Sequence, residues 1–394
     1  MSKVRRHLGI VVCLIVLAVA VTPAAPLGAA GPLLMPAGDA PTGVGSAAGT
    51  GPATGNSSSS TGAASASIGD AIAAGLQGIG ARIGGLLGSG GVSPAETGIS
   101  YGSDGRLTVL LIGSDWRPKG GGERTDVILV MSIDPTNGRV AAASIPRDVV
   151  FFPLHGGGTS GTDRVNTIYY LKYRHNSGHT HKFVDTAALN NFTKDVSLAL
   201  GVEIDYWAMV RFVGFVKLID KISGANVDIA DPITDTFYPS GNTRGIYFPK
   251  ATSYHLKGDP VCHPKPYHCH SALAYARSRH GTVGTGYNGD FPRARRQQTL
   301  TMAAAASFIA HISAGEYGDF VNYTVDKLWT NIPRNVTALG DLWNLAEGAH
   351  LAHHDTIVFG PSKWAHETAQ TPLYTYRLYL NLVRGWIDTH LYPI

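Results

Sequence analysis

The sequence predicts an α/β fold in three layers, with helices on both faces of a mixed sheet. Apolar runs of strand length alternate with longer segments of helical periodicity, and a short turn joins two of the strands as a hairpin. A long segment of low complexity precedes all of these elements. We therefore expect a single domain of catalytic size behind an N-terminal membrane anchor.

Residues 1–30 predict a membrane anchor or signal segment. Three basic residues precede an apolar run from Leu8 to Val21, and no charged residue follows until Asp39. The run is shorter than the roughly 20 residues of a spanning helix, so an anchor extended toward residue 28 and a cleaved signal peptide both fit it. We expect the anchor to be retained. Either alternative places the rest of the chain outside the cytoplasm.

Residues 31–103 are rich in Gly, Ala, Ser and Thr, which predicts a flexible linker. Apolar residues between Ile68 and Leu86 recur at helical spacing within it. The glycines among them each cost about 1 kcal/mol in a helix interior, so a linker is favoured over a helix on the membrane surface.

The predicted domain spans residues 104–390, with a core at 107–310. Its first strand is "LTVLLIG" at 107–113, and "DVILVMSI" and "RVAAASI" follow as two strands joined by the turn "DPTNG". The segment 184–201 predicts a helix that ends near Gly201, and "FVGFVKLIDKISG" predicts a helix that is closed by Gly224. Strands are predicted at "YWAMV" and "ANVDIADPI".

Two further helices are predicted at "SALAYARSR" and at 292–312, the second with Asp290 as its N-cap and Pro292 in its first turn. The remaining part, 311–390, is expected to be mostly helical, with one strand candidate at "DTIVFG". A loop at 259–270 is inserted before "SALAYARSR".

Charged residues stand at the ends of these apolar runs. Asp115 and Asp126 are carboxylates at strand ends, which suit Mg²⁺, or Mn²⁺ in its place, because such a cation takes one or two protein carboxylates plus phosphate oxygens. Taken singly, each is equally explained as a turn cap or an ion-pair partner.

An arginine cluster follows late in the chain. Arg293 and Arg296 share a face near a helix start, where backbone N–H groups favour anions, and Arg277 and Arg279 precede them. The planar guanidinium group of arginine suits phosphate oxygens, so the cluster is a candidate phosphate site. The alternative is that these arginines lie on a solvated, ion-paired helix face. Together with the two carboxylates, the cluster favours a Mg²⁺–pyrophosphate site.

Six motifs resemble, in the same order along the chain, those of a known family: "LLIGSDWR", "RTDVILVMSIDP", "AASIPRD", "LIDKISGANVDI", "ALAYARSRH" and "DFPRARRQQ". The chain resembles the LytR-CpsA-Psr family over about residues 107–310. Members of this family are phosphotransferases on the outer face of the bacterial membrane, which move a glycopolymer from a polyprenyl-pyrophosphate carrier to peptidoglycan. The composition hints at an actinobacterial source.

The resemblance implies roles for individual residues. Asp115 and Asp126 are expected to hold Mg²⁺, and an apolar pocket is expected to hold the polyprenyl tail. Catalytic roles are expected for Arg124, Arg147 and Asp126. The pyrophosphate is expected to contact Arg147, Arg277, Arg279, Arg293, Arg296 and Gln297. The lipid pocket is expected to be lined by Phe212, Phe215, Val216 and Ile219, with ordinary core packing as the alternative for each.

Departures from the family pattern accompany the resemblance. Arg211 stands in "VRF" where the family commonly has a shorter polar or acidic residue, and Pro292 replaces the glycine before Arg293. For Arg147, the alternative to a pyrophosphate contact is a structural ion pair with Asp148.

The inserted loop contains Cys262 and Cys269, with histidines beside them. Their spacing fits no common zinc site, and an oxidising exterior favours a disulfide over zinc.

The function predicted is thus transfer of a glycopolymer to a peptidoglycan acceptor, with membrane lipid as a further partner. A hydrolase that releases the polymer to water and a non-catalytic polyprenyl-lipid binding protein remain alternatives. Nucleic-acid binding is not expected, because the net charge of +4 is modest and the arginines lie beyond the anchor. The oligomeric state and the identity of the polymer are left open by the sequence.

Overall fold

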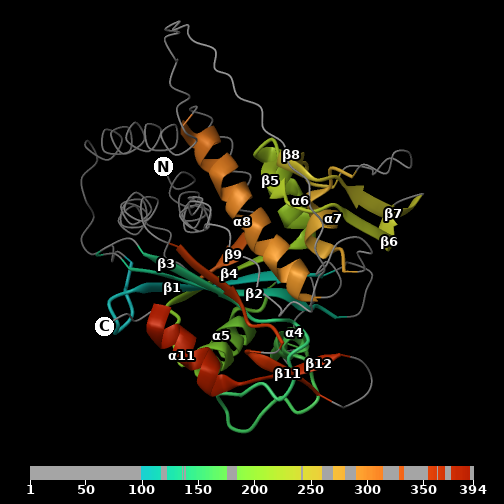
Figure 1. Cartoon of the computed structure of the whole chain (residues 1–394). Coiled ribbons are helices and arrows are strands. Elements are labelled where there is room, and N and C mark those ends of the chain that lie inside the picture. The colour runs from blue at the N-terminus through green and yellow to red at the C-terminus, as the bar shows by residue number, and fades with distance from the viewer. Residues whose placement is uncertain are drawn as a thin grey trace, which may run out of the picture.

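The computed structural model contains a mixed sheet between two helical layers (Figure 1). It describes residues 99–116, 122–134, 136, 139–174, 184–240, 243–259, 269–279, 290–313, 328–331, 354–361, 363–368 and 374–390. The sheet has six strands in the order β10-β3-β2-β1-β4-β9. The predicted fold class is confirmed.

The sheet contains both parallel and antiparallel strand pairs. β1 is antiparallel to β2 and parallel to β4, β3 is antiparallel to β2 and parallel to β10, and β9 is antiparallel to β4. The strands are β1 (Leu107–Ser114), β2 (Thr125–Ile133), β3 (Val140–Ser144), β4 (Tyr206–Arg211), β9 (Leu328–Thr330) and β10 (His354–Val358).

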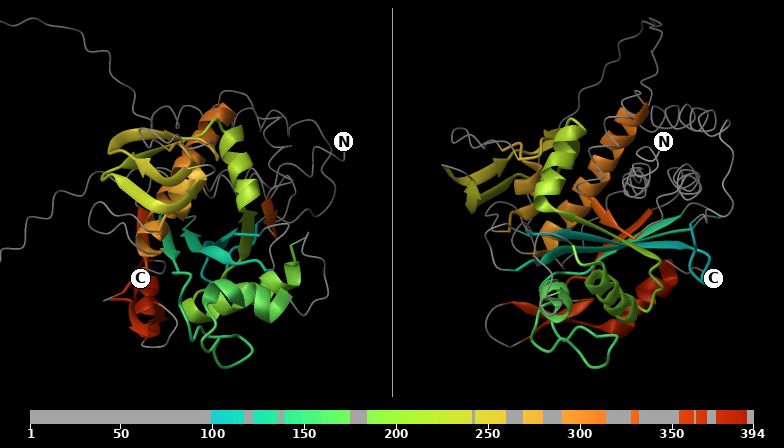
Figure 2. Two further views of the ribbon diagram at one scale, coloured as in Figure 1. Left: turned by 90° about the vertical axis from the view of Figure 1, so that its right-hand side faces the viewer. Right: turned by 180° about the vertical axis from the view of Figure 1, so that it is seen from behind.

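Different elements cover the two faces of the sheet, as the side views of Figure 2 also show. One face carries α4 (Val165–Ile168), a π-helical turn η1 (Tyr169–Arg174), α5 (Thr186–Leu200), α11 (Leu380–His390) and the small sheet β11 (Ala365–Thr368) and β12 (Thr375–Leu378). The other face carries α6 (Phe212–Lys221), α7 (Ala272–Arg277) and α8 (Asp290–Ser313). Two ribbons flank α6 and α7: β5 (Ala225–Ile229) with β8 (Ala251–Leu256), and β6 (Ile233–Ser240) with β7 (Thr243–Phe248).

The core forms where α5 packs on the sheet. Leu189, Phe192 and Val196 on the predicted helical stripe are buried against sheet residues such as Leu110 and Ile112. Every residue of β1 is buried, as expected of a central strand covered on both faces.

Both ends of α5 are capped, and its C-terminal end lies at Gly201 as the sequence predicts. The Asp185 side chain accepts a hydrogen bond from the Ala188 N–H, and Gly201 ends the helix in the left-handed region with φ 72°.

Three predictions of local structure need correction. The single strand predicted at "ANVDIADPI" is divided into β5 and β6, because Pro232 between them has no N–H for a ladder. The helix α8 begins at Asp290 itself, so this residue is not an outlying cap. In the described residues beyond 313, four short strands and one helix replace the mostly helical part that we expected, and one of those strands is the candidate at "DTIVFG".

Among the residues that the structure describes, no helix has the length and apolar character to span a membrane. The predicted anchor at 1–30 and almost all of the predicted linker lie outside those residues.

Candidate active site

The site forms at one edge of the sheet, where β1, β3 and β4 end and β2 begins. Asp115 follows β1, and its backbone N–H donates to the Arg124 carbonyl at 3.0 Å. The Arg124 N–H in turn donates to Asp115 Oδ1 at 2.8 Å. The two residues therefore face each other across the start of the hairpin, although the Arg124 side chain is exposed.

Asp126 occupies a break in the β1–β2 ladder. Gly113 pairs with Val127 and Ser114 pairs with Thr125, so Asp126 is the extra residue of a β-bulge. A bulge redirects the side chain of its extra residue and is common beside active sites. This local irregularity, which the apolar pattern of β2 does not reveal, places the Asp126 carboxylate against residues from other elements.

Arg147 joins three carboxylates at this edge. Its Nη1 atom lies 2.9 Å from Asp126 Oδ1, and its Nε atom lies 3.3 Å from Asp148 Oδ2 and 3.5 Å from Asp290 Oδ1. Asn166 on α4 donates to the same Asp126 oxygen at 2.9 Å. The pairing with Asp148 is therefore one part of a larger network and not an isolated ion pair.

Asp290 brings three arginines to a single oxygen atom. Its Oδ1 atom lies 2.9 Å from Arg293 Nη1, 3.5 Å from Arg279 Nη1 and 3.5 Å from Arg147 Nε. Arg293 is almost fully buried, and its Nε atom has no hydrogen-bond partner among the described residues. The three guanidinium groups thus converge on one anion position, which the carboxylate of the protein itself fills.

The charges at this position shift one another's proton affinities. Burial alone lowers the pKa of Arg147, but Asp126, Asp290 and Asp148 outweigh it and hold that pKa above its ordinary value. Burial, together with a hydrogen bond to Asp290, raises the pKa of Asp148 to about 7. Burial opposes ionisation of Asp290 as well, but the hydrogen bond from Asp148 and the arginine charges lower its pKa. One carboxyl of this pair therefore holds a proton near neutral pH.

Arg296 and Gln297, two of the predicted pyrophosphate residues, donate hydrogen bonds to backbone carbonyl groups. Arg296 donates through Nε to the Tyr275 carbonyl at 2.9 Å and through Nη2 to the Ser278 carbonyl. Gln297 donates to the Ala276 carbonyl at 3.1 Å. Both side chains bind the C-terminal end of α7, which fixes the segment that carries Arg277 and Arg279.

Arg277 lies toward α6 and the β6–β7 ribbon, with its Cζ atom 5.3 Å from the centre of the Phe212 ring and 5.9 Å from that of Tyr238. Of the predicted lipid-pocket residues, Phe212, Phe215 and Val216 are half-buried on α6, and Ile219 is buried. Phe212 therefore lies beside Arg277, which is one of the predicted pyrophosphate residues. Their role as a lipid lining stays a prediction.

The carboxylates of this edge suit Mg²⁺. No group of three or more His, Cys, Asp and Glu side chains able to hold a metal occurs within the described residues. Mg²⁺ does not require one, since one or two carboxylates with phosphate oxygens and water are its usual ligands. Asp126 fits this role because Arg147 and Asn166 both bind its Oδ1 atom and so orient the carboxylate.

The inserted loop at 259–270 lies mostly outside the described residues. Cys269 is in a disulfide bond, and Cys262, its predicted partner, is among the residues that the structure leaves out.

Reasoning from the sequence missed two members of the site. Asp290 was expected only to cap a helix, yet it is the counter-ion of three arginines. Asn166 follows no strand and belongs to no charged motif. For Asp290 a signal existed, since it stands beside the arginines of "DFPRARRQQ".

The fold and the site define an α/β protein with a cluster of arginines and carboxylates at one edge of its sheet, and comparisons with known proteins identify its family. The model of the LytR_cpsA_psr family matches residues 92–370, so the chain belongs to this family. It is 27% identical over 229 residues to a protein of Bacillus mycoides (strain KBAB4) named polyisoprenyl-teichoic acid–peptidoglycan teichoic acid transferase TagU, covering 58% of this chain and 61% of that protein. It is also 29% identical over 198 residues to the regulatory protein MsrR of Staphylococcus aureus (strain COL), covering 50% of this chain and 48% of that protein.

The matches therefore span about half to three-fifths of the length of these curated relatives. Among solved structures, that of TagV from B. subtilis is similar with a TM-score of 0.50 and 24% identity, covering 73% of this chain and 98% of that chain. This likeness shows the fold.

Proposed function

We propose that this protein is a Mg²⁺-dependent phosphotransferase that moves a glycopolymer from a polyprenyl-pyrophosphate carrier to peptidoglycan. The observation that carries the proposal is the convergence of Arg147, Arg279 and Arg293 on one oxygen of Asp290. Guanidinium groups brought together in this way suit the phosphate oxygens of a pyrophosphate. The family, and the name of the TagU relative, support the class of donor and acceptor.

The reaction has a simple balance of bonds. The oxygen of an acceptor sugar hydroxyl forms a bond to the phosphorus that carries the glycopolymer, and the bond from that phosphorus to the bridging oxygen breaks. Polyprenyl phosphate leaves with the bridging oxygen, and the hydroxyl proton passes to a base. A phosphodiester between polymer and peptidoglycan is the product.

The residues of the site serve this reaction by holding charge in place. Arg293 is buried and Arg147 half-buried, and both are held by carboxylates, so they neutralise phosphate oxygens with little reorganisation as negative charge develops. A bound pyrophosphate replaces the Asp290 carboxylate as the partner of these arginines. Asp115 and Asp126 hold Mg²⁺, which when bound neutralises further charge on the phosphate oxygens.

The decisive experiment is transfer of a labelled lipid-pyrophosphate glycan to peptidoglycan by the purified protein, with and without Mg²⁺. Label on peptidoglycan supports the proposal. Label released to water identifies a hydrolase, and binding without turnover identifies a lipid-binding protein.

Arg147→Ala tests the assignment of the site. Loss of one preorganised donor to the transition state typically lowers the rate by about 10²–10³. Arg139→Ala is the matched control, because Arg139 lies at the opposite end of β3 and pairs with Asp355 at 3.0 Å. Equal rates for wild type and Arg147→Ala, with circular dichroism showing both folded, refute the role.

We further propose that residues 1–30 stay attached as a single-pass anchor in the cytoplasmic membrane, with the domain outside the cytoplasm. The basic start and apolar run support this. Membrane fractionation and N-terminal sequencing test it, and a mature protein that begins near Gly31 contradicts it.

A further inference from the structure

A buried ionic cluster of Glu123, Arg174 and Arg211 lies beside the candidate active site. Arg211 donates through Nε to Glu123 Oε1 at 2.8 Å and through Nη2 to Oε2 at 3.1 Å, which is the two-pronged geometry of a strong arginine–carboxylate pair. Arg174 pairs through Nη1 with the same carboxylate. The three side chains are only 0–4% exposed.

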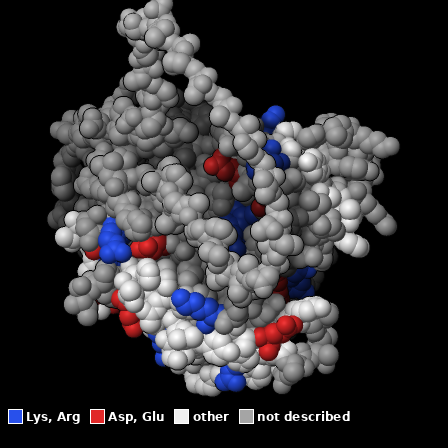
Figure 3. Space-filling model, in the orientation of Figure 1, with Lys and Arg blue, Asp and Glu red and all other residues white. Residues whose placement is uncertain are grey.

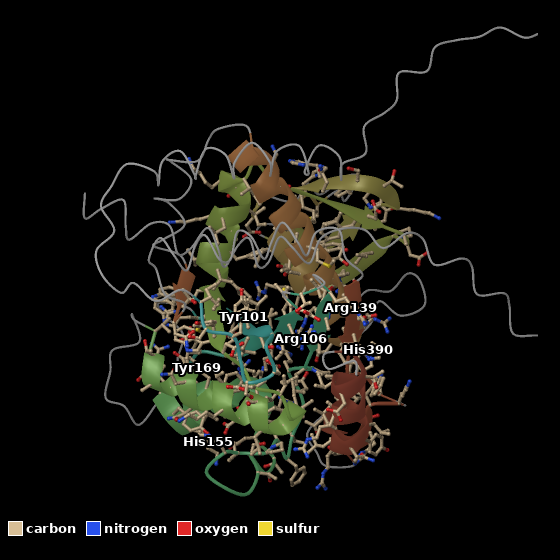
Figure 4. The ribbon with its side chains drawn as sticks, turned by 90° about the vertical axis from the view of Figure 1, so that its left-hand side faces the viewer. Tyr101, Arg106, Arg139, His155, Tyr169 and His390 are labelled. Atoms are coloured by element: carbon tan, nitrogen blue, oxygen red, sulfur yellow. The ribbon has the colours of Figure 1, made fainter. Side chains whose placement is uncertain are left out.

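The cluster lies on the α5 side of the sheet. Arg174 Cζ is 5.9 Å from the centre of the Tyr169 ring, and Figure 4 shows Tyr169 beneath the sheet and close to the helices of that layer. On the face that Figure 3 presents, described acidic and basic side chains are interspersed and form no broad patch of one sign.

Glu123 connects the cluster to both sides of the hairpin that carries the candidate metal ligand Asp115. The Ser114 hydroxyl donates to Glu123 Oε1 at 2.6 Å. Ser114 directly precedes Asp115, and Glu123 directly precedes Arg124. One buried carboxylate thus binds the residue before Asp115 and belongs to the residue before Arg124.

Arg211 also contacts the residue on the other side of Asp115. Its Cζ atom lies 4.2 Å from the centre of the Trp116 ring and 5.0 Å from that of Trp329. A planar guanidinium can stack flat on an aromatic ring, whereas a lysine ammonium offers the ring only a compact charge and no plane to stack. Both chain neighbours of Asp115, Ser114 and Trp116, are therefore held by Arg211 directly or through Glu123.

The charge balance separates the roles of the two arginines. Burial lowers the pKa of Arg174 and of Arg211 to about 10 each, so both stay charged at neutral pH. Arg174 interacts with Asp185 as well as with Glu123. If Arg211 is removed, Glu123 keeps Arg174 as its partner. If Glu123 is removed, two buried guanidinium groups lose the carboxylate that they share, which is a far more damaging change.

We propose that Arg211 is a positioning residue that orients Asp115 for the divalent cation, through Glu123 on one side of the hairpin and Trp116 on the other. The inference rests on the proposed function, since it assumes that Asp115 binds the cation. Residues that orient a metal ligand typically change metal affinity by about 10–100-fold when they are replaced.

The test is Mn²⁺ binding, measured by electron paramagnetic resonance of the free ion with and without inorganic pyrophosphate, in wild type, Arg211→Met and Arg211→Lys. We expect Mn²⁺ binding to weaken about 10–100-fold in Arg211→Met. Arg211→Lys keeps the charge but loses the fork and the stacking, so it should weaken binding almost as much. Transfer activity should return toward the wild-type rate at saturating Mn²⁺, because Arg211 does not touch the reacting atoms.

Two further variants keep the test sharp. Arg174→Met is the matched control, since it removes the other guanidinium of the cluster but leaves the contact of Arg211 with Trp116. The Mn²⁺ affinity of this variant should stay within about threefold of wild type, which is below the change expected for an orienting residue. Trp116→Leu leaves the buried charges intact and should weaken Mn²⁺ binding even if Arg211→Met does not fold.

The outcomes are distinct. Wild-type Mn²⁺ affinity in both Arg211→Lys and Trp116→Leu overturns the inference, as does an equal loss in Arg174→Met and Arg211→Met. A wild-type protein that transfers polymer and binds Mn²⁺ supports the proposed function even when the inference fails. A wild-type protein that binds no Mn²⁺ overturns the proposed metal site and the inference together.

Discussion

Replacement of Asp290 by asparagine tests the anion position most directly. The change keeps the size of the side chain but removes the charge that three arginines share. The Arg293 side chain is 5% exposed, so the change leaves it as a poorly solvated cation. The Arg147 side chain, 13% exposed, keeps Asp126 and Asp148 as partners, and Arg279 at 35% is largely compensated by water. The stability of the folded protein should therefore fall.

The magnitude follows from the burial. Removal of one partner from a buried ion pair typically costs about 3–5 kcal/mol. For a domain of this size each kcal/mol lowers Tm by about 2–4 °C, so we expect a fall of about 6–20 °C in Asp290→Asn. Inorganic pyrophosphate should restore much of this loss, because it supplies the missing negative charge to the same arginines.

The assay is thermal unfolding followed by circular dichroism, with and without inorganic pyrophosphate. Asp355→Asn is the matched control, since Asp355 also pairs with an arginine at 3.0 Å but on a more exposed part of the sheet. Exposed pairs contribute about 0–1 kcal/mol, so this variant should unfold close to wild type and respond to pyrophosphate as wild type does. A Tm for Asp290→Asn equal to that of wild type, or a pyrophosphate shift no larger than that of wild type, refutes the convergence of charge on Asp290.

Three other changes give separate tests. Asp126→Ala should lower the rate of transfer and raise the Mg²⁺ concentration that gives half-maximal transfer by about 10–100-fold, measured by titrating the metal. An unchanged titration removes Asp126 from the metal site. Because the pKa of Asp148 is raised to about 7, its folded-state proton stabilises the protein fully below about pH 4, and this contribution is lost as the pH rises through 7. The Tm of Asp148→Asn should accordingly fall less than that of wild type between about pH 5 and 8, and parallel curves contradict this. A Cβ at Gly258 would lie 2.5 Å from the Val216 carbonyl oxygen, so Gly258→Ala should push α6 away and destabilise the fold by about 1–3 kcal/mol in urea unfolding, and an unchanged midpoint argues against that close approach.

Local patterns in the sequence were enough to predict the main elements. The apolar run at 107–113 became β1, and the helical stripe at 184–201 became α5 with its end at Gly201, because each is decided by residues a few positions apart. The ordered motifs were likewise enough to predict the family. Beyond residue 313, β10 was a strand candidate in the sequence, but β9, β11 and β12 were not predictable in this way. β9 pairs with β4, which is distant in the chain, and β11 and β12 form a small separate ribbon.

The distribution of roles among the charged residues was decided only by the tertiary structure. Arg293 and Arg296 lie three positions apart on one helix and look equivalent in the sequence, yet one pairs with Asp290 and the other binds the end of α7. Asp126 reaches Arg147 because a bulge interrupts the ladder beside it. A charged residue at the end of a strand indicates that its side chain will form an ion pair or hydrogen bond. The identity of the partner depends on which distant elements fold against the same edge of the sheet.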